Sequence, residues 1–146
     1  MFKIFIIQLA IAITIIGCNT ADLYDENNYI EVTTKSKGDF AKEKIFWHKN
    51  DTNRVLIKLF HDGALRSKIF YYNGKKNGPI TLFQNNGVIM MEGFYQDDLK
   101  DGIHKIYDEN GNLYITEEYH LGKEKGIWTY HDSETGKVIS EEAHNN

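Results

Sequence analysis

The chain has 146 residues, with 17 Lys and Arg against 21 Asp and Glu, and a formal net charge of −4 at pH 7. This balance argues against nucleic acid as a partner, because nucleic-acid binding calls for a basic patch or stripe. It also argues against a polybasic attachment to anionic lipid. The length is sufficient for one small domain after an N-terminal leader.

Residues 1–17 are typical of a secretory signal peptide. Met1-Phe2-Lys3 provides a positive start, and the apolar run from Ile4 to Ile16 is too short to span a bilayer as a mature helix. Ile15-Ile16-Gly17-Cys18 resembles the lipobox of bacterial lipoproteins, whose cysteine is acylated and becomes the new N-terminus. We therefore expect a signal helix over 1–17 and lipidation of Cys18, the only cysteine. The alternatives are an uncleaved anchor and a buried helix.

Residues 18–38 are polar, and acidic at their start, which predicts a tether between the lipid and the folded domain. If flexible, such a segment has an r.m.s. reach on the order of 25 Å. The alternative is an added edge strand, because Tyr29-Ile30-Glu31-Val32 partly alternates between apolar and polar residues.

Glycines recur at fixed intervals through the rest of the chain. Leading glycines are spaced by 24, 24 and 25 residues, and each of the first three is followed fifteen residues later by another glycine. The leading set is Gly63, Gly87, Gly111 and Gly136, and the second set is Gly78, Gly102 and Gly126. A fixed period in the twenties predicts an array of one small unit. Such arrays present long surfaces and seldom build a deep catalytic pocket.

Each unit is typical of a β-hairpin, because its first arm alternates with period two and its second arm is short and apolar. The arms are separated by polar Gly-containing loops, and the units by Asn-Gly or Asp-Gly, which suit tight hairpin turns. We therefore expect an all-β domain over 39–146, built of tandem hairpins in one elongated, twisted antiparallel sheet. Its units are 39–62 (degenerate), 63–86, 87–110, 111–135 and 136–146 (partial).

The repeat resembles the bacterial variant of the MORN repeat, as found in YwqK-type proteins that carry a toxin–antitoxin antitoxin label. The third unit matches best, at Gly111, Leu113, Tyr119, Gly122, Lys123, Gly126, Trp128 and Tyr130. Tyr71 and Tyr95 correspond to Tyr119, whereas Ile80 and His104 stand where Trp128 is typical. The resemblance implies the hairpin fold and a role as a scaffold, membrane-proximal module or binding surface. It implies no catalytic residue.

A one-layer sheet of this size cannot bury both faces, so some aromatic side chains must stay partly exposed. The residues out of phase with the Leu/Tyr face are the best candidates for a binding surface. They are Phe70, Met90, Phe94 and Tyr114. The simpler interpretation is that the aromatic residues form the core and the ordinary faces of the sheet.

Residues with reactive side chains do not gather in a catalytic or metal-binding pattern. His61-Asp62 and His131-Asp132 look like dyads, but both precede turns, where polar pairs are common. His/Cys/Asp/Glu clusters at zinc spacing are not found, and Asp108 to Asn112 is too short for a calcium loop. We expect no enzyme activity, cofactor or metal.

Together these features predict a lipoprotein of the bacterial cell envelope, attached to the inner or outer membrane through Cys18. Its repeats are expected to act as a non-catalytic protein-interaction module, in the manner of an immunity factor or antitoxin. The alternative is a structural envelope spacer or scaffold, and a minor alternative is an enzyme of unknown class.

Overall fold

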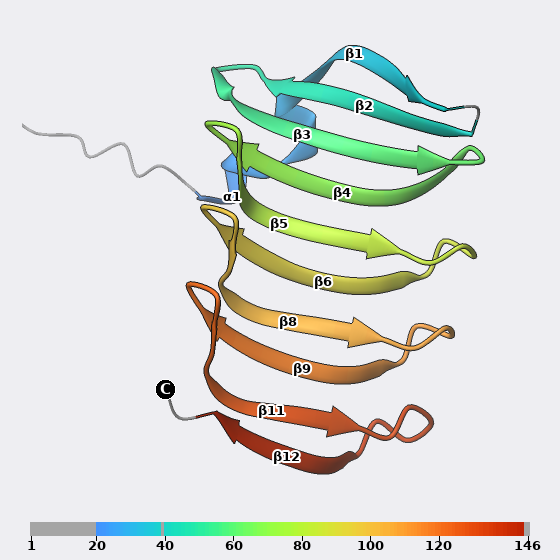
Figure 1. Ribbon diagram of the computed structural model, residues 1–146, viewed down its shortest axis with the longest axis vertical. Helices are drawn as coiled ribbons and strands as arrows, with labels where there is room; N and C mark the ends of the chain where they lie inside the picture. Colours follow the sequence, from blue (N-terminus) through green and yellow to red (C-terminus); the bar gives the residue numbers. More distant parts are fainter. Residues whose placement is uncertain (1–19, 39, 145–146) are drawn as a thin grey trace, which may run out of the picture.

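The repeats form one antiparallel sheet (Figure 1). The computed structural model describes residues 20–38 and 40–144. The sheet has 12 strands, and its main path, β1-β2-β3-β4-β5-β6-β8-β9-β11-β12, follows the order of the chain. The two-residue strands β7 and β10 pair with β6 and β9 beside this path. This confirms the predicted all-β fold of tandem hairpins. The expected signal helix and Cys18 lie outside the described residues.

The predicted repeat units each contribute one hairpin, and the partial unit contributes the last strand. In chain order the elements are α1 (Thr20–Leu23), η1 (Glu26–Asn28), β1 (Tyr29–Lys37), β2 (Ala41–His48), β3 (Asp51–His61), β4 (Ala64–Tyr72), β5 (Lys75–Phe83), β6 (Ile89–Gln96), β7 (Leu99–Lys100), β8 (Gly102–Tyr107), β9 (Leu113–His120), β10 (Lys123–Glu124), β11 (Gly126–His131) and β12 (Val138–His144).

The turns inside the units reverse the chain through two successive residues of positive φ. Asn73 and Gly74 have φ of 50° and 79°, and Leu121 and Gly122 have 47° and 84°. This is the conformation of the tight hairpin turns that match the twist of the strands. The turns of neighbouring units also bond to one another, since the Gly122 N–H donates to the Lys100 carbonyl over 2.7 Å.

The turns between units are of two kinds. Asp62-Gly63 has positive φ at both residues, as predicted. At Asn86-Gly87 and Asn110-Gly111 only the glycine has positive φ, so the expected two-residue turn is wrong there. The Gly87 N–H instead donates to Gln84 O (3.0 Å), and the Gln84 N–H to Val88 O (2.8 Å), which makes a longer loop.

A β-bulge occurs once per unit at the same phase. Register shifts leave one extra residue on the first arm of each hairpin, opposite the end of the preceding strand. The extra residues are Arg66, Met90, Tyr114 and Ile139. A bulge re-aims the side chain of its extra residue and increases the local twist.

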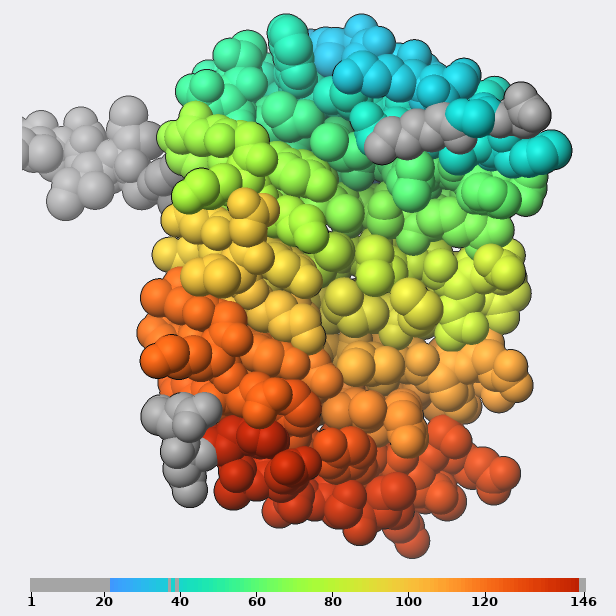
Figure 2. All heavy atoms as spheres, in the orientation of Figure 1, coloured from blue at the N-terminus to red at the C-terminus, as the bar shows by residue number. Residues whose placement is uncertain are grey.

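Alternation along the strands defines two faces of the sheet. We call them the Phe70 face, which includes Leu56, Phe70 and Phe94, and the Tyr119 face, which includes Tyr95 and Tyr119. Figure 2 shows the face turned away from α1 as a continuous surface from the first strand to the last.

The best-buried cluster lies on the Phe70 face, where the N-terminal segment covers it. Leu56 is 0% exposed, Phe70 6% and Tyr29 8%, and Tyr24 packs against them from outside the sheet. The predicted tether over 18–38 is therefore wrong for most of its length. Residues 29–37 form β1, the alternative edge strand, because their alternating side chains pair with β2 along its whole length.

The Tyr119 face carries a row of five rings from successive strands. Adjacent ring centroids lie 4.3–5.7 Å apart. The row consists of Tyr95, His104, Tyr119, Trp128 and His144. Aromatic pairs at such separations add stability beyond the burial of their area.

His104 takes the place of tryptophan in this row and makes the tryptophan's hydrogen bond. Trp128 Nε1 donates to Glu118 O over 3.2 Å, and His104 Nε2 lies 2.9 Å from Phe94 O, one unit earlier. Because the carbonyl can only accept, Nε2 carries the proton. Burial lowers the pKa of His104, which is 1% exposed, so the ring is neutral at pH 7.

Gly93 leaves the space that His104 fills. A Cβ at Gly93 would lie 2.2 Å from His104 Nδ1, and the φ of Gly93 is outside the left-handed region.

We expect Gly93→Ala to reduce the free energy of unfolding by about 1–3 kcal/mol, because the buried ring must move. Urea unfolding of the full chain measures this. Ser36→Ala in the exposed strand β1 is the control and should change stability by less than about 0.5 kcal/mol; equal stability of the two variants would contradict the packing.

Candidate binding surface

Tyr24 anchors the N-terminal segment on the Phe70 face. Its ring meets Phe70 and Phe94 edge-on, with centroids 5.5 and 5.8 Å apart. Gly78 makes room for it, since a Cβ there would lie 2.4 Å from Tyr24 Cε1. The Tyr29 hydroxyl donates to Leu23 O over 2.7 Å, which closes the segment onto the first strand.

Glu26 fixes the same segment by charge. Its carboxylate accepts from Lys58 and from Lys68, the latter over 2.9 Å. Burial raises the pKa of Glu26, but the hydrogen bonds from the two lysines outweigh burial and hold the pKa below its ordinary value. The segment is therefore attached by one aromatic ring and one carboxylate, each with two contacts, to strands far away in sequence.

Beyond the N-terminal segment, the Phe70 face exposes a set of apolar side chains, which we call the apolar patch. They come from β6, β8, β9, β11 and β12 and are each 41–63% exposed. The patch consists of Met90, Ile103, Tyr114, Ile127 and Ile139. Three of the five are bulge residues, and the other two directly follow the second glycine of their unit.

The four residues predicted as a binding surface do lie on one face, but in different surroundings. Phe70 is buried and does not fit a binding surface, because Tyr24 and Tyr29 cover it. Phe94 is partly covered by Tyr24. Met90 and Tyr114 are exposed within the patch.

Sequence reasoning missed Ile103, Ile127 and Ile139 as members of the patch. The repeat spacing held the signal for the first two, because both follow the second glycine of a unit, as Pro79 does. Ile139 occupies the phase of Met90 and Tyr114 once the extra residue of the third unit is counted.

The residues that resembled catalytic dyads lie where strands end, each histidine being the last residue of its strand. His61 Nδ1 lies 2.8 Å from Asp62 Oδ2, and both side chains are more than half exposed. His131 approaches Gly136 O instead, while Asp132 accepts from Thr135. Within residues 20–38 and 40–144 there is neither a pocket nor a group of three metal-ligating side chains.

The part of the chain that the structure describes contains no helix both long and apolar enough to cross a membrane.

Comparison with known proteins gives little likeness. Scans against protein-family models and curated proteins give no match. Among solved structures, TarM shares 16% identity over 73% of this chain and 21% of its own, at a TM-score of 0.37. A mutant of S. aureus TarM in complex with Fondaparinux, alpha-GlcNAc-glycerol and UDP shares 18% identity with this chain. The match covers 76% of this chain and 22% of that one, at a TM-score of 0.40. The chain thus spans about a fifth of TarM, and at these TM-scores the likeness says nothing of its function.

The ionic attachment of the N-terminal segment should depend on pH. Because the folded-state pKa of Glu26 is depressed, its contribution is fully present above the ordinary value of 4.5 and is lost as pH falls through the lowered pKa. Since the pair is partly solvent-screened, we expect Glu26→Gln to cost about 0.5–1 kcal/mol at pH 7. The difference from the wild type should shrink below about pH 4.

Urea unfolding of wild type and variant across pH measures this difference. Glu134→Gln, in the exposed turn before β12, is the control and should leave stability unchanged at every pH. A difference for Glu26→Gln that stays constant down to pH 2 would show that the carboxylate charge plays no part.

Proposed function

We propose that this chain is a lipid-anchored, non-catalytic protein of the bacterial cell envelope whose sheet binds a protein partner through the apolar patch. The observation that carries the proposal is the exposure of five large apolar side chains on one face. The three bulge residues form one row across this face, and the other two, Ile103 and Ile127, form a second row farther along the strands. Large apolar side chains that gather exposed on one face typically mark an interaction site.

The surroundings of the patch suit a protein partner. Polar and charged side chains on the same face lie among the apolar ones, including Lys105, Glu118 and Glu141. Aromatic and methionine side chains are enriched at protein interfaces, and the patch contains one of each, Tyr114 and Met90. The antitoxin label of the resembling family suggests a secreted toxin or effector as the partner.

The anchor is proposed from the lipobox-like residues before Cys18. A lipoprotein cysteine carries more than one acyl chain, and lasting attachment to a membrane needs at least two such signals. Only Asn19 separates Cys18 from α1, which begins at Thr20. A lipid on Cys18 would therefore be attached next to the part of the chain that packs on the sheet.

Removal of the cysteine should release the protein. We expect Cys18→Ala to move the chain from the membrane fraction to the soluble fraction, or to leave it unprocessed, because no thiol remains to be acylated. Fractionation and intact-mass measurement check this, with Ser36→Ala as the control. A wild-type protein that keeps Met1 and carries no lipid would contradict the anchor.

Disruption of the patch should abolish partner binding. We expect Ile127→Lys to reduce crosslinking of the chain to its partner in intact cells by about tenfold or more, because a charge replaces one of the exposed apolar side chains of the patch. Leu121→Lys makes the same change at an exposed turn outside the patch and should have no effect. Recovery of the chain without any crosslinked partner would contradict the interaction role and favour the spacer.

A further inference from the structure

The sheet ends in an open strand on each side. In the described residues β1 pairs only with β2, and β12 only with β11. The segment of α1 and η1 packs on the Phe70 face and not along the free edge of β1 (Figure 1). Open edges carry unpaired N–H and C=O groups that can pair with another strand. Repeat arrays usually cap their ends, and here both edges are long strands of seven and nine residues.

The number of strands makes the two edges compatible. The main path has ten strands and all its pairs are antiparallel, so β1 and β12 run in opposite directions. A second copy displaced along the stack and rotated by the accumulated twist of the sheet places its β1 antiparallel beside β12 of the first copy. That is the same pairing geometry as at every step within the sheet.

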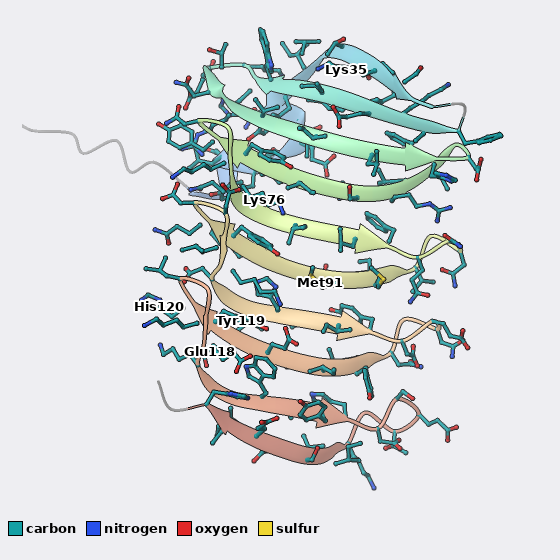
Figure 3. The ribbon with its side chains drawn as sticks, viewed as in Figure 1. Lys35, Lys76, Met91, Glu118, Tyr119 and His120 are labelled. Carbon is teal, nitrogen blue, oxygen red and sulfur yellow. The ribbon has the colours of Figure 1, made fainter. Side chains whose placement is uncertain are left out.

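Opposed residues also define where the next strand would fall. One unbroken row of paired residues crosses the whole sheet on the Tyr119 face, from Lys35 on β1, through Met91 (both labelled in Figure 3), to Ser140 on β12. Continuing the row into a second copy sets Ser140 opposite Lys35. Glu142, two residues along on the same face, then becomes the diagonal neighbour of Lys35, within reach of a long side chain.

The charges of the two edges favour unlike pairing. On β1, Glu31 is paired with Lys44 over 3.1 Å, whereas Lys35 is exposed and lies opposite Glu43 on its other side. On β12, Glu141 and Glu142 are both exposed. Two copies of β12 would bring carboxylates together, whereas β12 against β1 brings a carboxylate to a lysine.

We propose that the free edges bind a second copy of this chain, β12 of one copy pairing with the partner copy's β1 and placing Glu142 beside Lys35. The contact is head-to-tail and does not close, so copies add one after another and the mean size grows with concentration. The pairing uses the backbone edges of the strands, and it does not depend on the proposed function.

Charge reversal at each edge tests the pairing. The full chain, purified in detergent, is followed by sedimentation velocity over a concentration series. Lys35→Glu and Glu142→Lys should each weaken association by about fivefold or more, because each brings like charges together at the contact. Lys75→Glu at the exposed start of β5 and Glu109→Lys in an exposed turn make the same charge changes away from the edges, and both should associate like the wild type. Circular dichroism and the urea midpoint confirm that each variant is folded.

Mixing the variants separates head-to-tail pairing from other modes. An equimolar mixture of Lys35→Glu and Glu142→Lys should regain the association that each has lost, because every contact between the two variants joins opposite charges. The double variant should regain it alone. A wild type that stays monomeric at all concentrations, or edge variants that associate like the turn controls, would overturn the proposal. Association of single variants that mixing fails to restore would also overturn it.

Discussion

The structure depends on one constraint: a single-layer sheet has no second layer to cover it. Every apolar side chain must be covered by its neighbours in the sheet, by another part of the chain, or left exposed. The best-buried cluster therefore occurs where Tyr24 and Tyr29 lie over Leu56 and Phe70. Where that segment ends, the same face exposes the apolar patch. Burial and the candidate binding surface are thus two parts of one face, divided by the length of the N-terminal segment.

The repeat keeps geometry constant while chemistry changes. Bulges and positive-φ turns recur at the same phase, so equivalent side chains stack in columns two strands apart. In two successive units a lysine Nζ lies over a tyrosine ring, 5.1 and 4.2 Å from the ring centroid. In the last unit a glutamate and a histidine occupy the same positions, and their side chains are 3.0 Å apart. These pairs are Lys76 with Tyr95, Lys100 with Tyr119, and Glu124 with His144. A favourable contact thus survives a change of both residue types.

The sequence predicted features that depend on local chemistry and missed those that depend on distant contacts. Hairpins follow from alternation and from glycines at turn positions, and Asp62-Gly63 behaves as its residue types require. The covering of Phe70 depends on Tyr24, and the attachment of Glu26 depends on Lys68, 42 residues away. Neither contact leaves a periodic signal. A polar segment with few apolar residues therefore suggested a tether, although one ring and one carboxylate suffice to hold it on a preformed sheet.

The covering segment also changes what the proposed anchor implies. A flexible segment over 18–38 would let the sheet move on the order of 25 Å from its lipid. With Tyr24 packed on Phe70 and Phe94, only the residues between Cys18 and Tyr24 remain as a connection. Because Thr20–Leu23 of this connection form α1, which rises only about 1.5 Å per residue, the connection spans on the order of 10 Å. A sheet anchored in this way stays close to the bilayer, so a partner that binds the apolar patch must itself be able to approach the membrane surface.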